Sequence, residues 1–223
     1  MVNSLPFYIP LVFALAVALT LYIFYKASNR STPFLLIALT LIGVQSLVSQ
    51  TGFYATPGHP LRFLLLLPPP LAVAIGFSLT KKGKVFLATL DLPTLTLLHL
   101  ISIPVELVLY WLSLHHAVPK AMTFEGMNFD ILTGLSAPFI YYYGFVRKTL
   151  PVAWIVAWNW MGVALLVIVV SIAVRTAITA NLTGQTHSPL ALLLFPWTLL
   201  PGFMVPTVFF THYSTLVRLK AKK

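Results

Sequence analysis

Residues 95–114 read LTLLHLISIPVELVLYWLSL, a segment long enough to cross the hydrocarbon core of a bilayer, yet with a glutamate near its middle. At 100° per residue, its polar side chains fall in one narrow stripe of a helix, made by His99, Ser102, Glu106, Tyr110 and Ser113. A carboxylate in hydrocarbon costs at least about 2.5 kcal/mol. We therefore expect Glu106 to point into a helical bundle, toward protein partners or an internal cavity, and not toward lipid.

The composition of the whole chain is that of a polytopic membrane protein. Hydrophobic residues make up 59% of the 223 residues and charged residues only 8%, whereas soluble domains carry about 25% charged residues. The net charge is +10, but the basic residues stand in short clusters between apolar segments. They indicate orientation in a membrane rather than binding of nucleic acid. Because the chain has no cysteine, thiolate metal sites, disulfides and cysteine nucleophiles are excluded.

The chain is predicted to form one all-α domain, residues 1–223, built as a seven-helix transmembrane bundle. Seven apolar segments are long enough to span a bilayer: residues 6–25, 33–52, 61–80, 94–114, 129–146, 150–174 and 189–213. Their connections alternate between basic and nearly uncharged, with eleven Lys and Arg residues on one side and three on the other. The bias predicts an N-terminus outside and a C-terminus inside.

Prolines predict irregular backbone in the third and seventh spans. Pro68, Pro69 and Pro70 are consecutive, and the seventh span carries Pro196, Pro201 and Pro206. Proline removes a backbone donor and clashes with the preceding turn, so we expect both helices to be broken.

A first candidate site lies inside the predicted bundle. It consists of the stripe residues His99, Ser102, Glu106 and Tyr110, together with Asn159 and His212 of two later spans. Histidine and glutamate one or two turns apart can relay protons or bind a cationic or polar ligand. The alternative is a structural glutamate paired with His99, Arg62 or a tyrosine. Trp154, Trp158 and Trp160 are typical of an aromatic belt at the membrane interface.

A second candidate site is the outer cluster, in the two outer loops. Its members are His115, His116, Glu125, Asn128, Asp130 and His187. Histidine and carboxylate ligands suit zinc or another divalent ion. The alternative is helix capping, with Asn128 as an N-cap and Asp130 complementing the helix dipole.

Three short motifs carry a resemblance: PVE at 104–106, MTFEG at 122–126 and NFD at 128–130, with FP at 195–196 and His212 matching less closely. On these motifs the chain resembles a family of uncharacterised seven-helix bacterial membrane proteins. Members often have an arginine just before the PVE motif, where this chain has Ser102. The resemblance implies a bacterial inner-membrane protein and adds no mechanism.

Several function classes are excluded. No lysine occurs between Lys148 and Lys220, so retinal cannot be bound as in a rhodopsin, and no Walker A, HExxH or GxSxG motif is present. The leading interpretation is a membrane protein with a polar cavity on the fourth span that binds or transports a small molecule or ion. One alternative is a membrane-embedded, metal-assisted enzyme that uses the outer cluster. Another is an accessory subunit that binds a protein partner or forms an oligomer.

Overall fold

The polar-faced segment forms a helix with one tight turn in it. In the computed structural model, α5 (Leu92–Leu98) is followed by the 3-10 turn η4 (His99–Ile101) and then by α6 (Ser102–Leu114). Asp91 caps α5, because its Oδ2 accepts the Thr94 backbone N–H at 3.1 Å. The segment is longer than predicted at its N-terminal end, because this cap and the following proline favour a helix start at Leu92.

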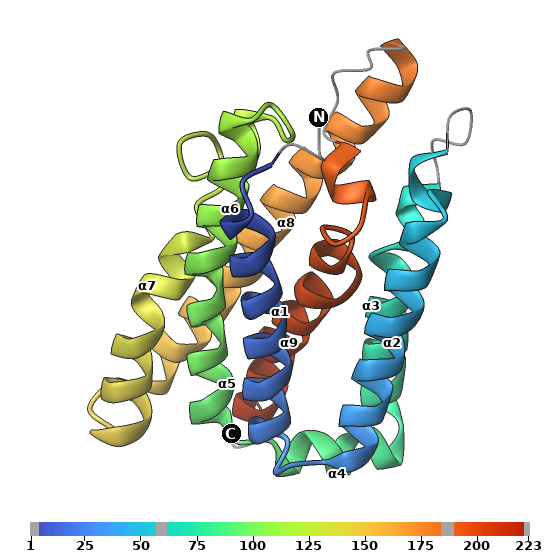
Figure 1. Ribbon diagram of the computed structural model, residues 1–223. Coiled ribbons are helices and arrows are strands. Elements are labelled where there is room, and N and C mark those ends of the chain that lie inside the picture. Colours follow the sequence, from blue (N-terminus) through green and yellow to red (C-terminus); the bar gives the residue numbers. More distant parts are fainter. Residues whose placement is uncertain (1–4, 57–61, 184–189, 221–223) are drawn as a thin grey trace.

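The structure describes residues 5–56, 62–183 and 190–220, and in these ranges it contains helices and no strand (Figure 1). The other α-helices are α1 (Tyr8–Ala27), α2 (Thr32–Gln50), α3 (Pro68–Leu79), α4 (Lys81–Thr89), α7 (Ile131–Phe139), α8 (Val152–Thr183) and α9 (Val205–Lys220). The π-helical stretch η6 (Ile140–Val146) follows α7, and a second one, η8 (Leu200–Met204), precedes α9. The other short 3-10 turns are η2 (Phe53–Ala55), η3 (Arg62–Leu65), η5 (Lys120–Met122) and η7 (Leu190–Leu193).

Within the described residues, five helical segments are long and apolar enough to cross a membrane. They are Tyr8–Ala27, Thr32–Gln50, Arg62–Leu79, Leu92–Leu114 and Val152–Thr179, and Ile131–Val146 is a shorter apolar helix. This is the architecture of a helical integral membrane protein.

Two predicted boundaries were wrong. Residues 81–89, predicted as a connection, form the amphipathic helix α4, whose first turn is capped by the Thr80 hydroxyl accepting the Gly83 N–H at 3.0 Å. The last helix runs to Lys220 and not to residue 213, since no proline or glycine follows Pro206 to end it.

The prolines of the third and seventh predicted spans lie at helix starts and in irregular turns. Pro68–Pro70 form the first turn of α3, where a missing N–H leaves no intrahelical bond unmade. Pro201 lies in the π-helical stretch η8, and Pro206 in the first turn of α9. The chain therefore enters α9 through π-helical backbone and not through a continuous helix.

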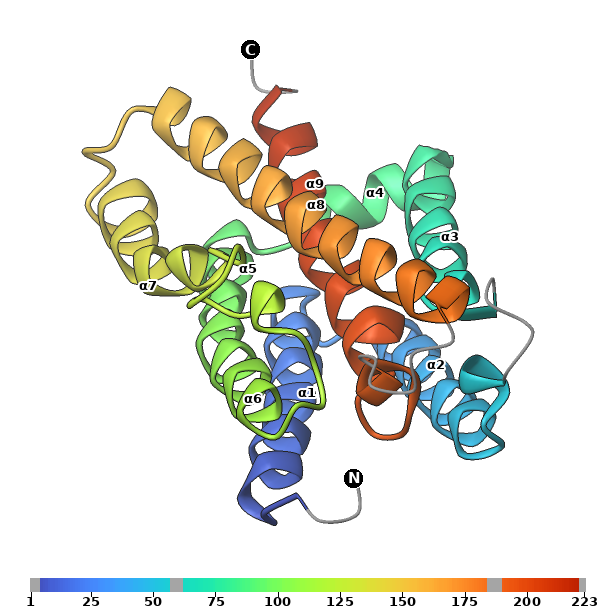
Figure 2. The ribbon, with the colours of Figure 1, turned by 90° about the horizontal axis from the view of Figure 1, so that it is seen from above.

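The α5–α6 segment packs against α1 and α7 on one side of α9, α8 crosses over α9, and α2 and α3 lie on the other side of α9 (Figure 2). The core is apolar and closely packed around Leu95, Leu98 and Leu112, each 0% exposed. This arrangement encloses the polar face of α6.

Candidate functional site

The two histidines that follow α6, His115 and His116, terminate the helix. His116 has a φ of 55°, and its N–H donates to the Ser113 carbonyl at 2.9 Å. The next N–H, of Ala117, donates to the Leu112 carbonyl at 2.8 Å. These two bonds with a left-handed residue between them form a Schellman motif. The chain then turns back over the end of α6.

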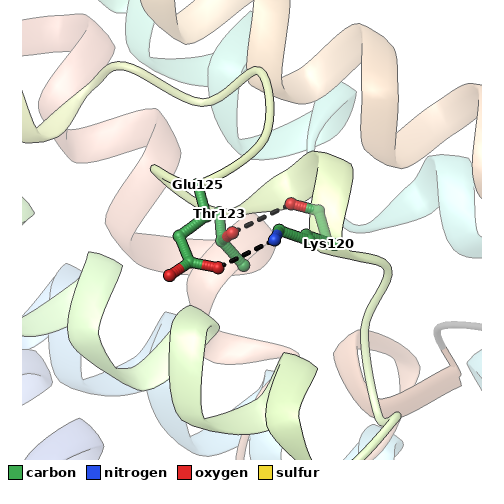
Figure 3. A network of polar contacts seen from close by, with 3 residues as sticks. All are labelled: Lys120, Thr123 and Glu125. Carbon is green, nitrogen blue, oxygen red and sulfur yellow. Dashed lines mark hydrogen bonds and ion pairs between the residues drawn. The ribbon is translucent and has the colours of Figure 1, made fainter.

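The loop after α6 is a compact turn held by short-range bonds. Lys120 Nζ lies 3.0 Å from Glu125 Oε2, and the Thr123 hydroxyl donates to the Lys120 carbonyl at 2.9 Å (Figure 3). Gly126 passes so close to the Lys120 backbone that a Cβ at this position would clash with it. Only glycine fits this approach, and the turn delivers Asn128 to the interior.

Asn128 connects this loop to Glu106. Its Nδ2 donates to Glu106 Oε1 and, at 3.1 Å, to the Met122 carbonyl, while its Oδ1 accepts the Asp130 N–H at 3.2 Å. Glu106 is 2% exposed and Asn128 1%. The expectation that Glu106 points into the bundle is confirmed. Its second oxygen, Oε2, is buried and has no hydrogen-bond partner among the described residues.

Asp130 is a second buried carboxyl group on the same wall, and both of its oxygens have partners. The Ser102 hydroxyl donates to Oδ2 at 2.7 Å, and the Thr133 hydroxyl lies 3.1 Å from Oδ1. Asp130 thus ties α6 to the first turn of α7. The two carboxyl groups therefore differ, because each oxygen of Asp130 has a hydrogen-bond partner, whereas Glu106 Oε2 has none among the described residues.

Both carboxyl groups line a cavity of about 290 Å³. Its polar residues come from α6 and the loop before α7, namely Ser102, Glu106, Asn128 and Asp130, whereas its other walls are apolar and come from η3 and the start of α3, from α8, and from η7, η8 and α9. The cavity thus combines one polar wall with a largely aliphatic interior, as small-molecule sites do.

His99 faces away from this cavity and meets His212 of α9. The two rings stack with centroids 3.9 Å apart, and Trp158 meets His99 edge-on at 5.1 Å. His99 Nε2 lies 3.0 Å from the Thr211 hydroxyl, and His212 Nδ1 lies 3.0 Å from Asn159 Oδ1. Asn159 of α8 thus bonds to α9 through His212. This histidine pair joins α5–α6, α8 and α9.

The neighbouring bonds assign a tautomer to each uncharged ring. The Thr211 hydroxyl already donates to the Val208 carbonyl, so His99 Nε2 must be the donor to Thr211. The Asn159 amide donates through Nδ2, so its Oδ1 accepts from His212 Nδ1. His212 Nε2 then faces Gly162 of α8, where an added Cβ would overlap the ring.

The residues of the predicted outer cluster separate. His115, His116 and Glu125 are exposed, whereas Asn128 and Asp130 are buried against α6. In the part of the chain that the structure describes, no three His, Asp or Glu side chains lie close enough to hold a metal ion. The predicted convergence is therefore wrong for these residues, because the helix stop and the loop turn the two halves of the cluster in opposite directions. His187 lies outside the described residues.

Other predicted positions have specific partners. Tyr110 packs against Phe124, with ring centroids 5.1 Å apart. Arg62, an alternative partner for Glu106, instead donates to Thr56 Oγ1 at 3.1 Å. Trp158 was wrongly placed in an aromatic belt: it is 6% exposed, and its Nε1 donates to the Ser136 hydroxyl at 2.8 Å. Its ring instead lies edge-on to both rings of the histidine pair.

Sequence reasoning missed Thr133 and Thr211. Thr133 follows Asp130 by three residues, a spacing at which a hydroxyl returns to a helix start, so the sequence did contain a signal. Thr211 contacts His99 from 112 positions away, and no local pattern indicates that contact.

Comparison with protein-family models, with curated proteins and with solved structures gives no match for this chain. The resemblance drawn from the motifs at 104–106 and 122–130 stays a prediction, and the functional argument rests on the geometry of the cavity.

Proposed function

We propose that this protein crosses the membrane seven times and binds a small molecule in the cavity beside Glu106, as one step in moving it across the bilayer. The observation that carries the proposal is the buried, unpartnered Oε2 of Glu106 on the wall of a cavity of about 290 Å³. A buried acceptor without a partner costs about 1–3 kcal/mol or more, and a bound molecule that donates to it would remove that cost.

The irregular backbone around the cavity supports a transport role. Leu200 and Pro201 of the π-helical stretch η8 line the cavity, as does Pro68 at the start of α3. Transporters commonly place their binding sites at interrupted helices, because irregular backbone is tolerated at membrane depth where it lines a cavity. The third and seventh crossings are, on this proposal, the interrupted ones.

The placement of basic residues supports the orientation. The connection between α1 and α2, helix α4, the connection between α7 and α8, and the end of α9 all lie at one end of the molecule, the lower end in Figure 1. These segments carry Lys26, Arg30, Lys81, Lys82, Lys84, Arg147, Lys148, Arg218 and Lys220. By the positive-inside rule this end is cytoplasmic. We place the protein in a bacterial inner membrane, with the cavity in the outer half.

The absence of cysteine from the chain allows a direct test of the cavity. Ala173 lines the cavity, whereas Ala137 of α7 is 0% exposed and is not among the lining residues. The two Ala→Cys variants make equal changes of side chain. In lipid nanodiscs, we expect neutral methyl methanethiosulfonate to modify Ala173→Cys, and Ala137→Cys only after unfolding in SDS, as measured by mass spectrometry. Equal protection of both thiols contradicts an accessible binding cavity.

A further inference from the structure

We infer that the cavity selects an amphipathic cation, with a primary or secondary ammonium group at Glu106 and a small apolar body among the aliphatic walls. This inference rests on the proposed function and names the class of molecule bound at the same site. It follows from the acidic side chains of the wall, the unpartnered carboxyl oxygen of Glu106 and the shape of the remaining surface.

The wall carries half of the acidic side chains of the chain. The chain has four acidic residues, and two of them, Glu106 and Asp130, line the cavity. The described lining residues include no Lys, Arg or His. The other two acids are engaged elsewhere, Asp91 as the cap of α5 and Glu125 with Lys120. A cation is therefore favoured over an anion by the groups that face the ligand.

Glu106 offers one directional acceptor to that cation. Its Oε1 is held by Asn128, which fixes the carboxyl plane, and its Oε2 is left without a partner. Asp130 adds a second acidic group, but each of its oxygens already has a partner in the Ser102 or the Thr133 hydroxyl. An ammonium N–H donated to Oε2 gives a charge-assisted bond in a water-poor setting.

The apolar part of the cavity determines which kind of ligand body can bind. A bare metal cation needs about six or more oxygen ligands, and the interior beyond the polar wall is made of side chains such as Leu166, Val170, Met204 and Val208. These walls favour a hydrocarbon body. Phe63 is the one aromatic side chain among the described lining residues, so the aromatic cage that suits a quaternary ammonium is not present there. A hydrogen-bonding ammonium fits better.

The test uses phenethylammonium and three close analogues that change only the head group. These are 2-phenylethanol, which is neutral, 3-phenylpropionate, which is an anion, and phenethyltrimethylammonium, which keeps the charge but has no N–H. Binding to full-length protein in nanodiscs is measured by calorimetry, with empty nanodiscs subtracted. We expect phenethylammonium to bind at least tenfold more tightly than each analogue.

Three variants separate charge at the site from charge in general. Glu106→Gln should weaken phenethylammonium binding at least tenfold and abolish the preference over 2-phenylethanol. Glu106→Asp keeps the carboxylate and should keep the preference at lower affinity. Glu125→Gln makes the same chemical change on an exposed side chain and should bind as the unaltered protein does. Gel filtration monitors folding of all three.

The outcomes of these experiments distinguish failure of the cation inference from failure of the proposed function on which it rests. Equal or tighter binding of an analogue, or unchanged binding by Glu106→Gln, overturns the cation inference while leaving a binding cavity. Failure of all four probes also overturns it, and the labelling of Ala173→Cys then decides separately whether the cavity is accessible. If Glu106→Gln does not fold, the head-group preferences of Glu106→Asp and of the unaltered protein still test the cation inference.

Discussion

Helix α8 passes close to the histidine pair at Gly162, and replacement of Gly162 by alanine tests the packing of α8 against α9. An added Cβ would overlap the Cε1 and Nε2 atoms of His212. The ring has little room to withdraw, because His99 stacks on it at 3.9 Å and its Nδ1 is bonded to Asn159 at 3.0 Å. We expect Gly162→Ala to destabilise the fold.

Two opposing effects set the size of the change. Alanine in a helix interior is favoured over glycine by about 0.5–1 kcal/mol. Overpacking a filled core costs about 1–3 kcal/mol, and displacing His212 from Asn159 adds about 1–3 kcal/mol for a buried bond left unmade. The steric effect is larger, so we expect a net loss of roughly 1–5 kcal/mol.

The measurement is reversible unfolding in mixed micelles, followed by tryptophan fluorescence, because Trp158 contacts both histidine rings. Gly43→Ala in α2 is the matched control, since a Cβ there meets no atom within 4 Å. In a His212→Ala background, Gly162→Ala should be neutral or stabilising. If Gly162→Ala is as stable as Gly43→Ala in the otherwise unaltered chain, the close packing of α8 against His212 described above is contradicted.

Three further predictions concern topology and local contacts. With single cysteines in intact cells, Lys120→Cys should react with a membrane-impermeant maleimide and Lys82→Cys only after permeabilisation; the reverse pattern contradicts the orientation. Asp91→Ala should cost about 0.5–2 kcal/mol in micelle unfolding, because the cap on Thr94 is lost, and no change would show that the cap is dispensable. Glu125→Gln should change stability by less than about 1 kcal/mol, since its pair with Lys120 is exposed; a larger loss would show that this pair holds the loop.

The helical stripe was the part of the site that sequence could predict. The helical period and the cost of a charge in lipid predicted that Glu106 points into the bundle, and its exposed fraction of 2% agrees. The stripe does not stay together, however, because His99 stacks on His212 of α9, whereas Ser102 and Glu106 line the cavity. Helical period gives the direction of each side chain around its own helix, but it does not give the neighbouring helix that the side chain meets.

The outer loop shows why partners across the fold could not be predicted. Asn128 and Asp130 were expected to cap a helix or to bind metal with nearby histidines. Their side chains instead turn inward to Glu106 and Ser102. That direction is set by the left-handed residue His116 and by the close approach at Gly126. These backbone features arise from three-dimensional packing, and the amino-acid sequence indicates them only weakly.

The most direct measurement of the proposed site is an experimental structure of the protein in a lipid nanodisc with phenethylammonium, at a resolution that shows waters and small ligands. We expect density for the probe in the cavity, with its nitrogen within hydrogen-bond distance of Glu106 Oε2 and its ring between α8 and α9. A cavity filled by the protein's own side chains, or a Glu106 carboxyl group that faces lipid or bonds to another residue through Oε2, would contradict the proposed binding site.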